Sequence, residues 1–363
     1  MPYPHRKINE NYKNMKILVT GGTGFIGSHT TVELQQQGYD VIIVDALFNS
    51  RIEALDAIAS ITGKKPEFEQ FDLADRAKVD DFFRRHQDIK GVIHFAAHKA
   101  VGESVEHPLK YYRNNLDSLM NILESMNKYG VENLVFSSSC TVYGEPDPEN
   151  LPISEKAPIK KAECPYGNTK QIAEEIMQDC IVAYKGLNAI ALRYFNPVGA
   201  HESAKLGELP FGVPANLMPY VTQTAYGIRP FLRVFGNDYD TPDGTPIRDY
   251  IHIMDLAKAH VKAVERMIQG NMKANFEVFN VGTGTGYSVL DIIKSFERSN
   301  NLKLKYEIVG RRAGDIVKIW ADPTYTNKEL GWKAERTLDD MTHSAWEWEK
   351  AYRAGKTCFK IEN

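Results

Sequence analysis

The segment that decides the fold is KILVTGGTGFIG, residues 16–27. KILVT is a short apolar run typical of a buried strand, and the glycines after it precede a helical pattern from Ile26 to Gln37. Gly21, Gly24 and Gly27 have the spacing of a glycine loop, in which the backbone can approach a pyrophosphate at a helix N-terminus. Because this loop stands between a strand and a helix, we predict the first βαβ unit of a dinucleotide-binding domain.

An acidic residue, Asp45, closes the second predicted strand, DVIIVD. A carboxylate at this position accepts hydrogen bonds from the adenine ribose 2′-hydroxyl and repels a 2′-phosphate, which favours NAD over NADP. Asp72, at the end of FEQFD, could contact the adenine or could be a solvated strand end. The sequence therefore predicts NAD as the cofactor.

Short apolar runs alternate with amphipathic ones over residues 15–196. The predicted strands are KILVT, DVIIVD, FEQFD, GVIHFAA, NLVFSS and NAIALRYF, and helical patterns between them include Arg76–His86, Lys110–Lys128 and Gly167–Tyr184. Strands separated by helices of this length imply crossover connections and a parallel sheet covered on both faces. We therefore predict an α/β fold with a doubly wound Rossmann sheet as the NAD-binding domain.

The pattern changes after Asn196, where NPVGAHESAKLGELPFGVP is typical of a long loop. A segment near 249–285 contains FEVFNVG, which could return to the main sheet. The pieces 197–248 and 286–355 are expected to form a smaller, discontinuous α/β lobe that binds the substrate. Within this lobe, Asp339 or Asp340 is expected to open the last helix.

The composition argues against several classes of function. The chain has 363 residues and a formal net charge of -3, which gives no electrostatic reason to expect binding to nucleic acid or to an anionic membrane. No apolar run approaches membrane-spanning length. The four cysteines are scattered and His94, His98 and His252 lie in unrelated segments, so we expect reduced thiols, a cytoplasmic protein and no metal site. Residues 1–14 are polar and are expected to be a flexible extension.

Tyr166 and Lys170 stand four residues apart in PYGNTK, downstream of the serines of FSSSCTVYG. On a helix such residues share a face, so the lysine lies one turn beyond the tyrosine. A free phenol has a pKa of about 10, and an ammonium group together with a positive nicotinamide ring favours the phenolate. Ser137, Ser138 and Ser139 end a predicted strand, where open α/β sheets bind ligands. We predict that Tyr166 removes the proton of a sugar hydroxyl while hydride passes to NAD.

Further motifs extend this pattern along the chain: TGGTGFIGSH, HFAAHKAVGESV, FSSSCTVYG, PYGNTK, LRYFNP, NLMPY, VFGNDYDTPDGT, RDYIH and NVGTGTGYSV. Together they resemble the UDP-glucose 4-epimerases, a family of extended short-chain dehydrogenase/reductases, from about Lys16 to Trp348. The resemblance implies a homodimeric cytosolic isomerase of galactose metabolism with tightly bound NAD. It further implies that UDP-glucose and UDP-galactose interconvert through a 4-keto intermediate.

The resemblance also implies roles for single residues. Ser139 contacts the substrate hydroxyl, Tyr166 is the base, and Lys170 tunes the tyrosine. The residues that it implies for cofactor binding are Gly21, Gly24, Phe25, Ile26, Gly27, Asp45, Asn49, Asp72, Leu73, Phe95, Ala96, Lys99, Asn114, Tyr166, Lys170 and Tyr194. Those that it implies for substrate binding are Ser139, Asn196, Asn216, Leu217, Phe235, Arg248, Arg312, Asp315 and Ile319.

The chain departs from the family pattern at a few positions. Ala46 stands where asparagine is often found, and Ala97 and His98 stand where glycine and leucine are usual. More consequential is Ile319, at the gate beside the hexose, where a large tyrosine excludes N-acetylated sugars and a small cysteine admits them. Isoleucine is intermediate in size, so a UDP-N-acetylhexosamine 4-epimerase with a relaxed gate is the alternative function.

Two other functions use the same fold. A nucleotide-sugar 4,6-dehydratase would need an Asp-Glu pair beside the serines, where this chain has Cys140 and Thr141. A non-catalytic NAD(H)-binding protein would not need Tyr166, Lys170 and Ser139 together. Both functions are therefore less favoured than epimerisation.

Overall fold

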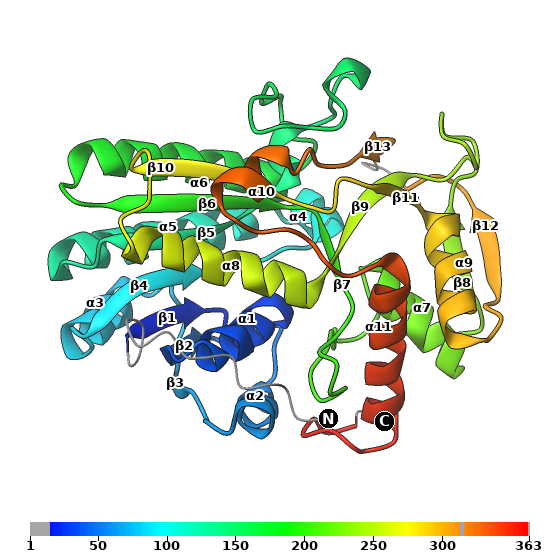
Figure 1. Cartoon of the computed structure of the whole chain (residues 1–363), viewed down its shortest axis with the longest axis horizontal. Helices are drawn as coiled ribbons and strands as arrows, with labels where there is room; N and C mark the ends of the chain where they lie inside the picture. The colour runs from blue at the N-terminus through cyan, green and yellow to red at the C-terminus, as the bar shows by residue number, and fades with distance from the viewer. Residues whose placement is uncertain (1–14, 313–315, 362–363) are drawn as a thin grey trace.

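A parallel sheet forms the centre of the structure (Figure 1). The computed structural model describes residues 15–312 and 316–361, and within them this sheet has seven strands in the order β10-β6-β5-β4-β1-β2-β3. The strands are β1 (Lys16–Thr20), β2 (Asp40–Asp45), β3 (Glu67–Gln70), β4 (Ile89–His94), β5 (Asn133–Ser139), β6 (Asn188–Tyr194) and β10 (Phe276–Val281). All neighbouring strands pair in parallel, as expected for βαβ crossovers.

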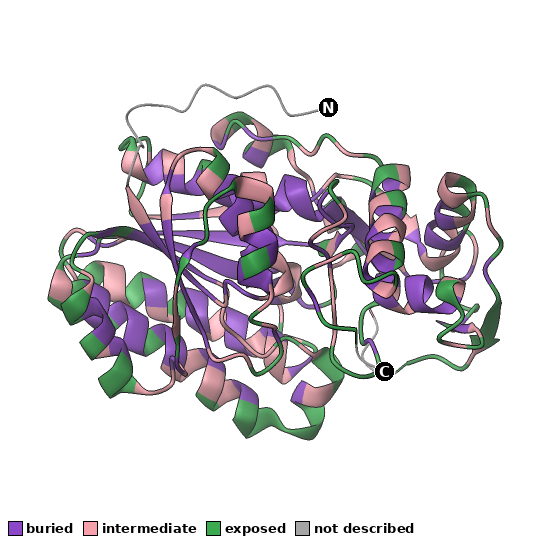
Figure 2. Cartoon of the chain, turned by 90° about the horizontal axis from the view of Figure 1, so that it is seen from below, coloured by how far each residue is buried: buried purple, intermediate pink, exposed green. Residues whose placement is uncertain are grey.

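Helices cover both faces of this sheet, and its strands are mostly buried, apart from the partly exposed edge strand β3 (Figure 2). One face is covered by α1 (Phe25–Gln36), α2 (Ala54–Thr62) and α8 (Ile253–Ile268). The other is covered by α3 (Arg76–Arg85), α5 (Pro108–Tyr129) and α6 (Pro165–Ala183), with the short α4 (Val101–Glu106) beside them. Successive strand residues point to opposite faces, so Ile17 and Val19 join one apolar core and Leu18 joins the other. The predicted doubly wound α/β fold is confirmed.

A second group of elements lies beyond the carboxyl ends of the strands (Figure 1). Its strands are β7 (Asn196–Val198), β8 (Leu232–Phe235), β9 (Ile247–His252), β11 (Gly286–Ser288), β12 (Tyr306–Val309) and β13 (Lys318–Ile319). Its helices are α7 (Leu217–Tyr226), α9 (Val289–Asn300) and α11 (Leu338–Arg353), and α10 (Thr324–Glu329) packs against β10. Strand β9 pairs with β7, β11 and β13, while β8 pairs with β12.

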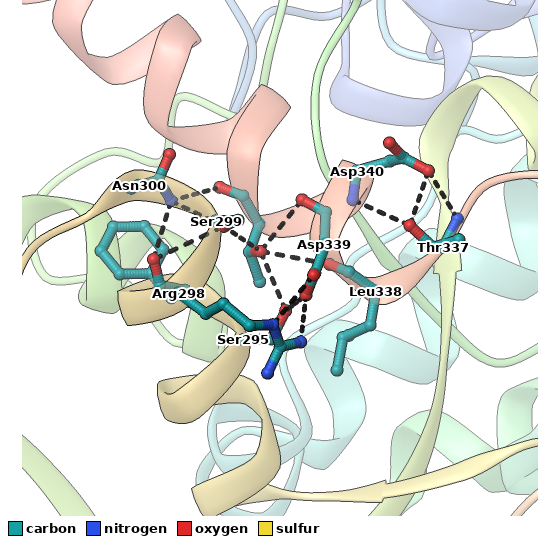
Figure 3. A network of polar contacts seen from close by, with 10 residues as sticks. Ser295, Arg298, Ser299, Asn300, Thr337, Leu338, Asp339 and Asp340 are labelled. Carbon is teal, nitrogen blue, oxygen red and sulfur yellow. Dashed lines mark hydrogen bonds and ion pairs between the residues drawn. The ribbon is translucent and has the colours of Figure 1, made fainter.

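The start of the last helix differs from the prediction. α11 begins at Leu338, and Thr337 is its N-cap, with Asp340 completing a capping box. The expectation that Asp339 or Asp340 opens this helix is therefore wrong. Asp339 instead accepts hydrogen bonds from Ser295 (2.6 Å) and Arg298 (3.0 Å), which join α11 to α9 (Figure 3).

Candidate active site

The turn between β1 and α1 accommodates only glycine at positions 21 and 27. Gly21 has a φ of +67°, and a Cβ on Gly27 would lie 2.4 Å from the Gly21 carbonyl oxygen. Gly24 is the N-cap of α1 and offers no side-chain cap, so the first-turn amides of the helix are left for a ligand. A small, amide-lined turn at a helix N-terminus fits the pyrophosphate of NAD.

Asp45 is buried at the end of β2 and organises the loop that follows. Its Oδ1 accepts hydrogen bonds from the Leu47 amide (2.9 Å) and the Ser50 hydroxyl (2.9 Å), and its Oδ2 accepts one from the Thr23 amide (3.2 Å). A carboxylate has about four acceptor positions, so Asp45 can hold this loop and also accept a bond from a ribose hydroxyl.

Most of the other predicted cofactor residues lie along the same edge of the sheet. Asp72 and Leu73 follow β3, and the Asp72 carboxylate accepts from the Ala74 amide (2.9 Å) in a local turn. Phe95 and Ala96 follow β4 and are tied to β1 through Thr20. The remaining positions are Phe25 and Ile26 in the first turn of α1, Asn49 in the loop after β2, Asn114 on α5 and Tyr194 at the end of β6.

The three predicted catalytic residues come together at the carboxyl end of β5. α6 begins at Pro165, a position where proline is favoured, and this places Tyr166 and Lys170 on its first two turns. The Lys170 Nζ donates to the Ser137 carbonyl oxygen (2.6 Å) and lies 5.8 Å from the Tyr166 ring centroid. The Ser139 hydroxyl acts on the Tyr166 phenol and favours its ionised form, so it lowers the pKa of Tyr166 against the larger upward effect of burial.

Burial opposes ionisation of this pair. It raises the pKa of Tyr166 and lowers the pKa of Lys170 to about 7, although the negative charge of Glu174 counteracts the second shift. The sequence led us to expect a lowered tyrosine pKa. The polypeptide by itself produces the opposite shift, because desolvation by burial is the largest contribution and disfavours the charged phenolate. A positive nicotinamide ring held beside the phenol would lower the pKa of Tyr166, as its role as a base requires.

Two polar residues near this cluster escaped prediction as site residues. The Thr141 hydroxyl is buried and, among the described residues, has no hydrogen-bond partner, which marks it as a candidate ligand contact. Asn115 binds the His98 amide (2.8 Å) and carbonyl (3.0 Å) and so fixes the loop after β4. Neither residue stood out in the sequence, because Thr141 follows three other hydroxyl-bearing residues in SSSCTVYG and Asn115 is adjacent to the predicted Asn114.

The second group of elements contributes the predicted nucleotide contacts. Arg248 lies on β9 directly opposite Ile319 on β13, and its charge acts on Cys140, the neighbour of Ser139. The Arg312 guanidinium lies 5.7 Å above the ring of Phe235, at the end of β8. Asp315 lies outside the described residues.

A carboxylate that was not predicted lies between two predicted groups. Asn216, the N-cap of α7, donates to Glu208 Oε1 (2.6 Å), and the Lys99 Nζ lies 3.6 Å from the same oxygen. A predicted cofactor residue and a predicted substrate residue therefore converge on Glu208. Asn196 and Leu217 are the first residues of β7 and α7. Within the described part of the chain, no group of three or more His, Cys, Asp or Glu could hold a metal ion.

Known proteins resemble this chain over nearly its whole length. It is 50% identical over 337 residues to the UDP-glucose 4-epimerase of Bacillus subtilis (strain 168), covering 93% of this chain and 97% of the relative. Identity to the UDP-glucose 4-epimerase of Yersinia enterocolitica is 48% over 344 residues, covering 95% of this chain and 100% of the relative. The crystal structure of UDP-glucose 4-epimerase from Bifidobacterium longum, in complex with NAD+ and UDP, matches with a TM-score of 0.89 at 48% identity, covering 94% of this chain and 99% of that one.

A family model agrees with these relatives. The model described as the NAD dependent epimerase/dehydratase family matches residues 17–282, which is more than half of the chain. This range contains the glycine turn, the Ser139, Tyr166 and Lys170 cluster, and the return of β10 to the sheet. The chain belongs to the NAD dependent epimerase/dehydratase family.

Proposed function

We propose that this chain is an NAD-dependent isomerase that interconverts UDP-glucose and UDP-galactose by epimerisation at C4. The observation that carries the proposal is the meeting of Ser139, Tyr166 and Lys170 at the sheet edge that also bears the glycine turn. The relatives named UDP-glucose 4-epimerase, at about half identity over almost the whole chain, support the same activity.

In the proposed reaction, Lys170 stabilises the phenolate form of Tyr166, and this phenolate takes the proton of the sugar C4 hydroxyl, which Ser139 orients. Bound NAD supplies hydride acceptance at C4 and returns the hydride to the opposite face of the 4-keto sugar. Both faces can be reached only if the hexose turns while the nucleotide stays fixed. We therefore assign the firm contacts to the UDP end, at Phe235, Arg248 and Arg312.

The purified protein, without added cofactor, is expected to convert UDP-galactose to UDP-glucose and back, because NAD is regenerated in each cycle. The sugars are resolved by anion-exchange chromatography, and NAD is measured after release from denatured protein. A deoxy-4-keto product would favour the dehydratase alternative. NAD content without any conversion of UDP-sugars would favour the non-catalytic binding protein.

The size of residue 319 is expected to set the choice between plain and N-acetylated hexoses. Ile319 is 2% exposed and packs with Tyr143 and Phe195. We expect Ile319→Tyr to lower, and Ile319→Cys to raise, the kcat/KM ratio of UDP-N-acetylglucosamine to UDP-glucose by about tenfold each, a typical effect of small changes in pocket size. Lys318→Ala is the control, because successive residues of a strand point to opposite faces. An unchanged ratio in both Ile319 variants would remove this residue from the gate.

We also propose that the protein is a cytoplasmic homodimer. The outward sides of α4 and α5 expose the apolar residues Val101, Val105, Leu109 and Met120, which a second copy could cover. The four cysteines are all free, as is usual in a reducing compartment. None of the helices within residues 15–312 and 316–361 has both the length and the apolar character needed to cross a bilayer. The mass of one chain is 41.0 kDa, and sedimentation equilibrium is expected to give twice this mass.

A further inference from the structure

A buried ion pair lies directly beneath the Tyr166 and Lys170 pair. Glu174 follows Lys170 by four residues on α6, so the two side chains share a helix face. Glu174 is 3% exposed and Arg193, on β6, is 5% exposed. The Arg193 Nε lies 3.0 Å from Glu174 Oε1 and its second terminal nitrogen lies 2.5 Å from Oε2, which is a bidentate contact.

Each partner of this ion pair has a further polar contact. The Ser138 hydroxyl donates to Glu174 Oε1 (2.6 Å), so the strand that carries Ser139 is joined to the helix that carries Tyr166. Arg193 also donates to the Tyr143 hydroxyl (2.9 Å), which in turn donates to the Asn280 side-chain oxygen (2.7 Å). These contacts fix the Glu174 carboxylate, which lies one helical turn beyond Lys170 on α6.

Stability alone is a poor explanation for this arrangement. A buried ion pair loses hydration on both charges, and apolar side chains of similar volume often stabilise a protein as well or better. The Lys170 ammonium, by contrast, has a clear need for an anion. It is 4% exposed, donates to the Ser137 carbonyl oxygen and lies 4.7 Å from the centre of the Phe136 ring, and neither contact supplies a full negative charge.

Four titratable groups on the elements around Lys170 carry no charge between pH 6 and 9. Burial raises the pKa of Tyr143, of Cys140 and of Tyr194 to about 12 each, and it lowers the pKa of His94 on β4 to about 3. More distant groups on the packed elements are Glu103 on α4, Tyr111 on α5, Cys164 at the start of α6, and Glu155, which bonds to Asn280. The acidic group whose charge acts on Lys170 is Glu174.

We propose that Glu174, held by Arg193 and Ser138, is the counter-anion that keeps Lys170 protonated, and is thus a positioning residue for the Tyr166 and Lys170 pair. This inference rests on the proposed function, since it assigns Glu174 to the same proton transfer. Glu174 acts through Lys170: without its charge, the ammonium loses its proton at lower pH, and the phenolate of Tyr166 then loses its nearest cation.

The test is Glu174→Gln in the full-length protein, which keeps the shape of the side chain and removes its charge. We expect the pH at which kcat falls to half on the alkaline side to move down by about one unit, a change typical of losing one nearby charge. The ratio of wild-type to variant kcat therefore grows roughly tenfold from pH 6 to pH 9. KM for UDP-galactose is expected to stay within about twofold, because Glu174 is assigned to the proton transfer and not to substrate binding.

Two control variants separate charge from structure. Glu175→Gln removes the same charge from the adjacent, exposed position of α6 and is expected to leave the pH profile unchanged. Glu174→Asp keeps the charge and shortens the side chain, so it is expected to lower thermal stability while the alkaline limit stays near that of the wild type. If Glu174→Gln does not fold, Glu174→Leu combined with Arg193→Leu avoids a lone buried charge and is expected to show the same shift.

Denaturant unfolding between pH 6 and 9 provides a second measurement that does not depend on turnover. The folded-state pKa of Lys170 lies below its unfolded value, so the unfolded chain binds more protons and the free energy of unfolding rises with pH above about 7. In Glu174→Gln this rise is expected to begin about one unit lower. The proposal is overturned if, in Glu174→Gln, the free energy of unfolding begins to rise at the same pH as in the wild type and kcat is reduced equally at every pH. Absence of epimerase activity in the wild type would contradict the proposed function instead, and the unfolding onset would still decide the role of Glu174.

Discussion

Tyr166→Phe is expected to lower kcat for UDP-galactose by about 10²–10⁴, the range that a positioned general base contributes. The phenylalanine ring keeps the packing of the first turn of α6, and the change removes only the phenol hydroxyl on which Ser139 acts. NAD content is expected to stay at the wild-type level, because the glycine turn and Asp45 are untouched. The measurement is the steady-state rate of UDP-galactose conversion together with NAD released per chain.

A matched control is available on the neighbouring helix. The Tyr112 hydroxyl of α5 accepts a hydrogen bond from Asn168 on α6 (2.7 Å), away from the Ser139 contact. Tyr112→Phe therefore removes a tyrosine hydroxyl that also contacts α6, and kcat is expected to stay within about twofold of the wild type. If Tyr166→Phe keeps more than about a tenth of the wild-type kcat with full NAD content, another group is the base.

The main sheet could be predicted because its strands are buried on both faces. Each of β1, β2, β5 and β6 contains an uninterrupted run of three or four apolar residues, and the amphipathic segments between them have helical periodicity. The prediction was less accurate where a local turn competes with the strand. FEQFD suggested a strand to Asp72, but β3 ends at Gln70 because the Asp72 carboxylate binds the Ala74 amide.

Elements that depend on distant partners could not be predicted. β7, β11 and β13 are two or three residues long, too short to show a period, and each forms by pairing with β9. α2 was missed because its sequence, ALDAIASIT, is short and two of its four buried residues are alanine. Its position comes from packing against α1.

The residues of the candidate site also divide into those that belong to a local motif and those that depend on distant partners. Tyr166, Lys170 and the glycines were found because each belongs to a local motif with fixed spacing. Glu174 and Glu208 were missed because their significance comes from partners far along the chain, as in the contact of Glu208 with Lys99. Residue spacing showed the lysine but not the depth of burial, which raises the pKa of Tyr166 in the polypeptide without the cofactor.

Gly27→Ala is expected to abolish most cofactor retention. A Cβ at this position would lie 2.4 Å from the Gly21 carbonyl oxygen and 2.8 Å from the Gly22 Cα, and both atoms belong to the backbone of the turn. Neither can move aside like a flexible side chain, so α1 must shift away from β1 and widen the site for the pyrophosphate. Overpacking of this kind costs about 1–3 kcal/mol, which corresponds to a loss of NAD affinity of roughly 5- to 150-fold if it falls on the bound state.

The measurement for Gly27→Ala is NAD per chain after gel filtration, with circular dichroism and a melting curve to establish that the protein is folded. Gly102→Ala is the control, because a Cβ on this glycine of α4 would meet no atom within 4 Å and alanine favours a helix. We expect the control to keep wild-type NAD content and Gly27→Ala to lose most of it. A folded Gly27→Ala protein that retains NAD at the wild-type level would show that this turn does not form the phosphate site, since the clash would then be absorbed without loss of the cofactor.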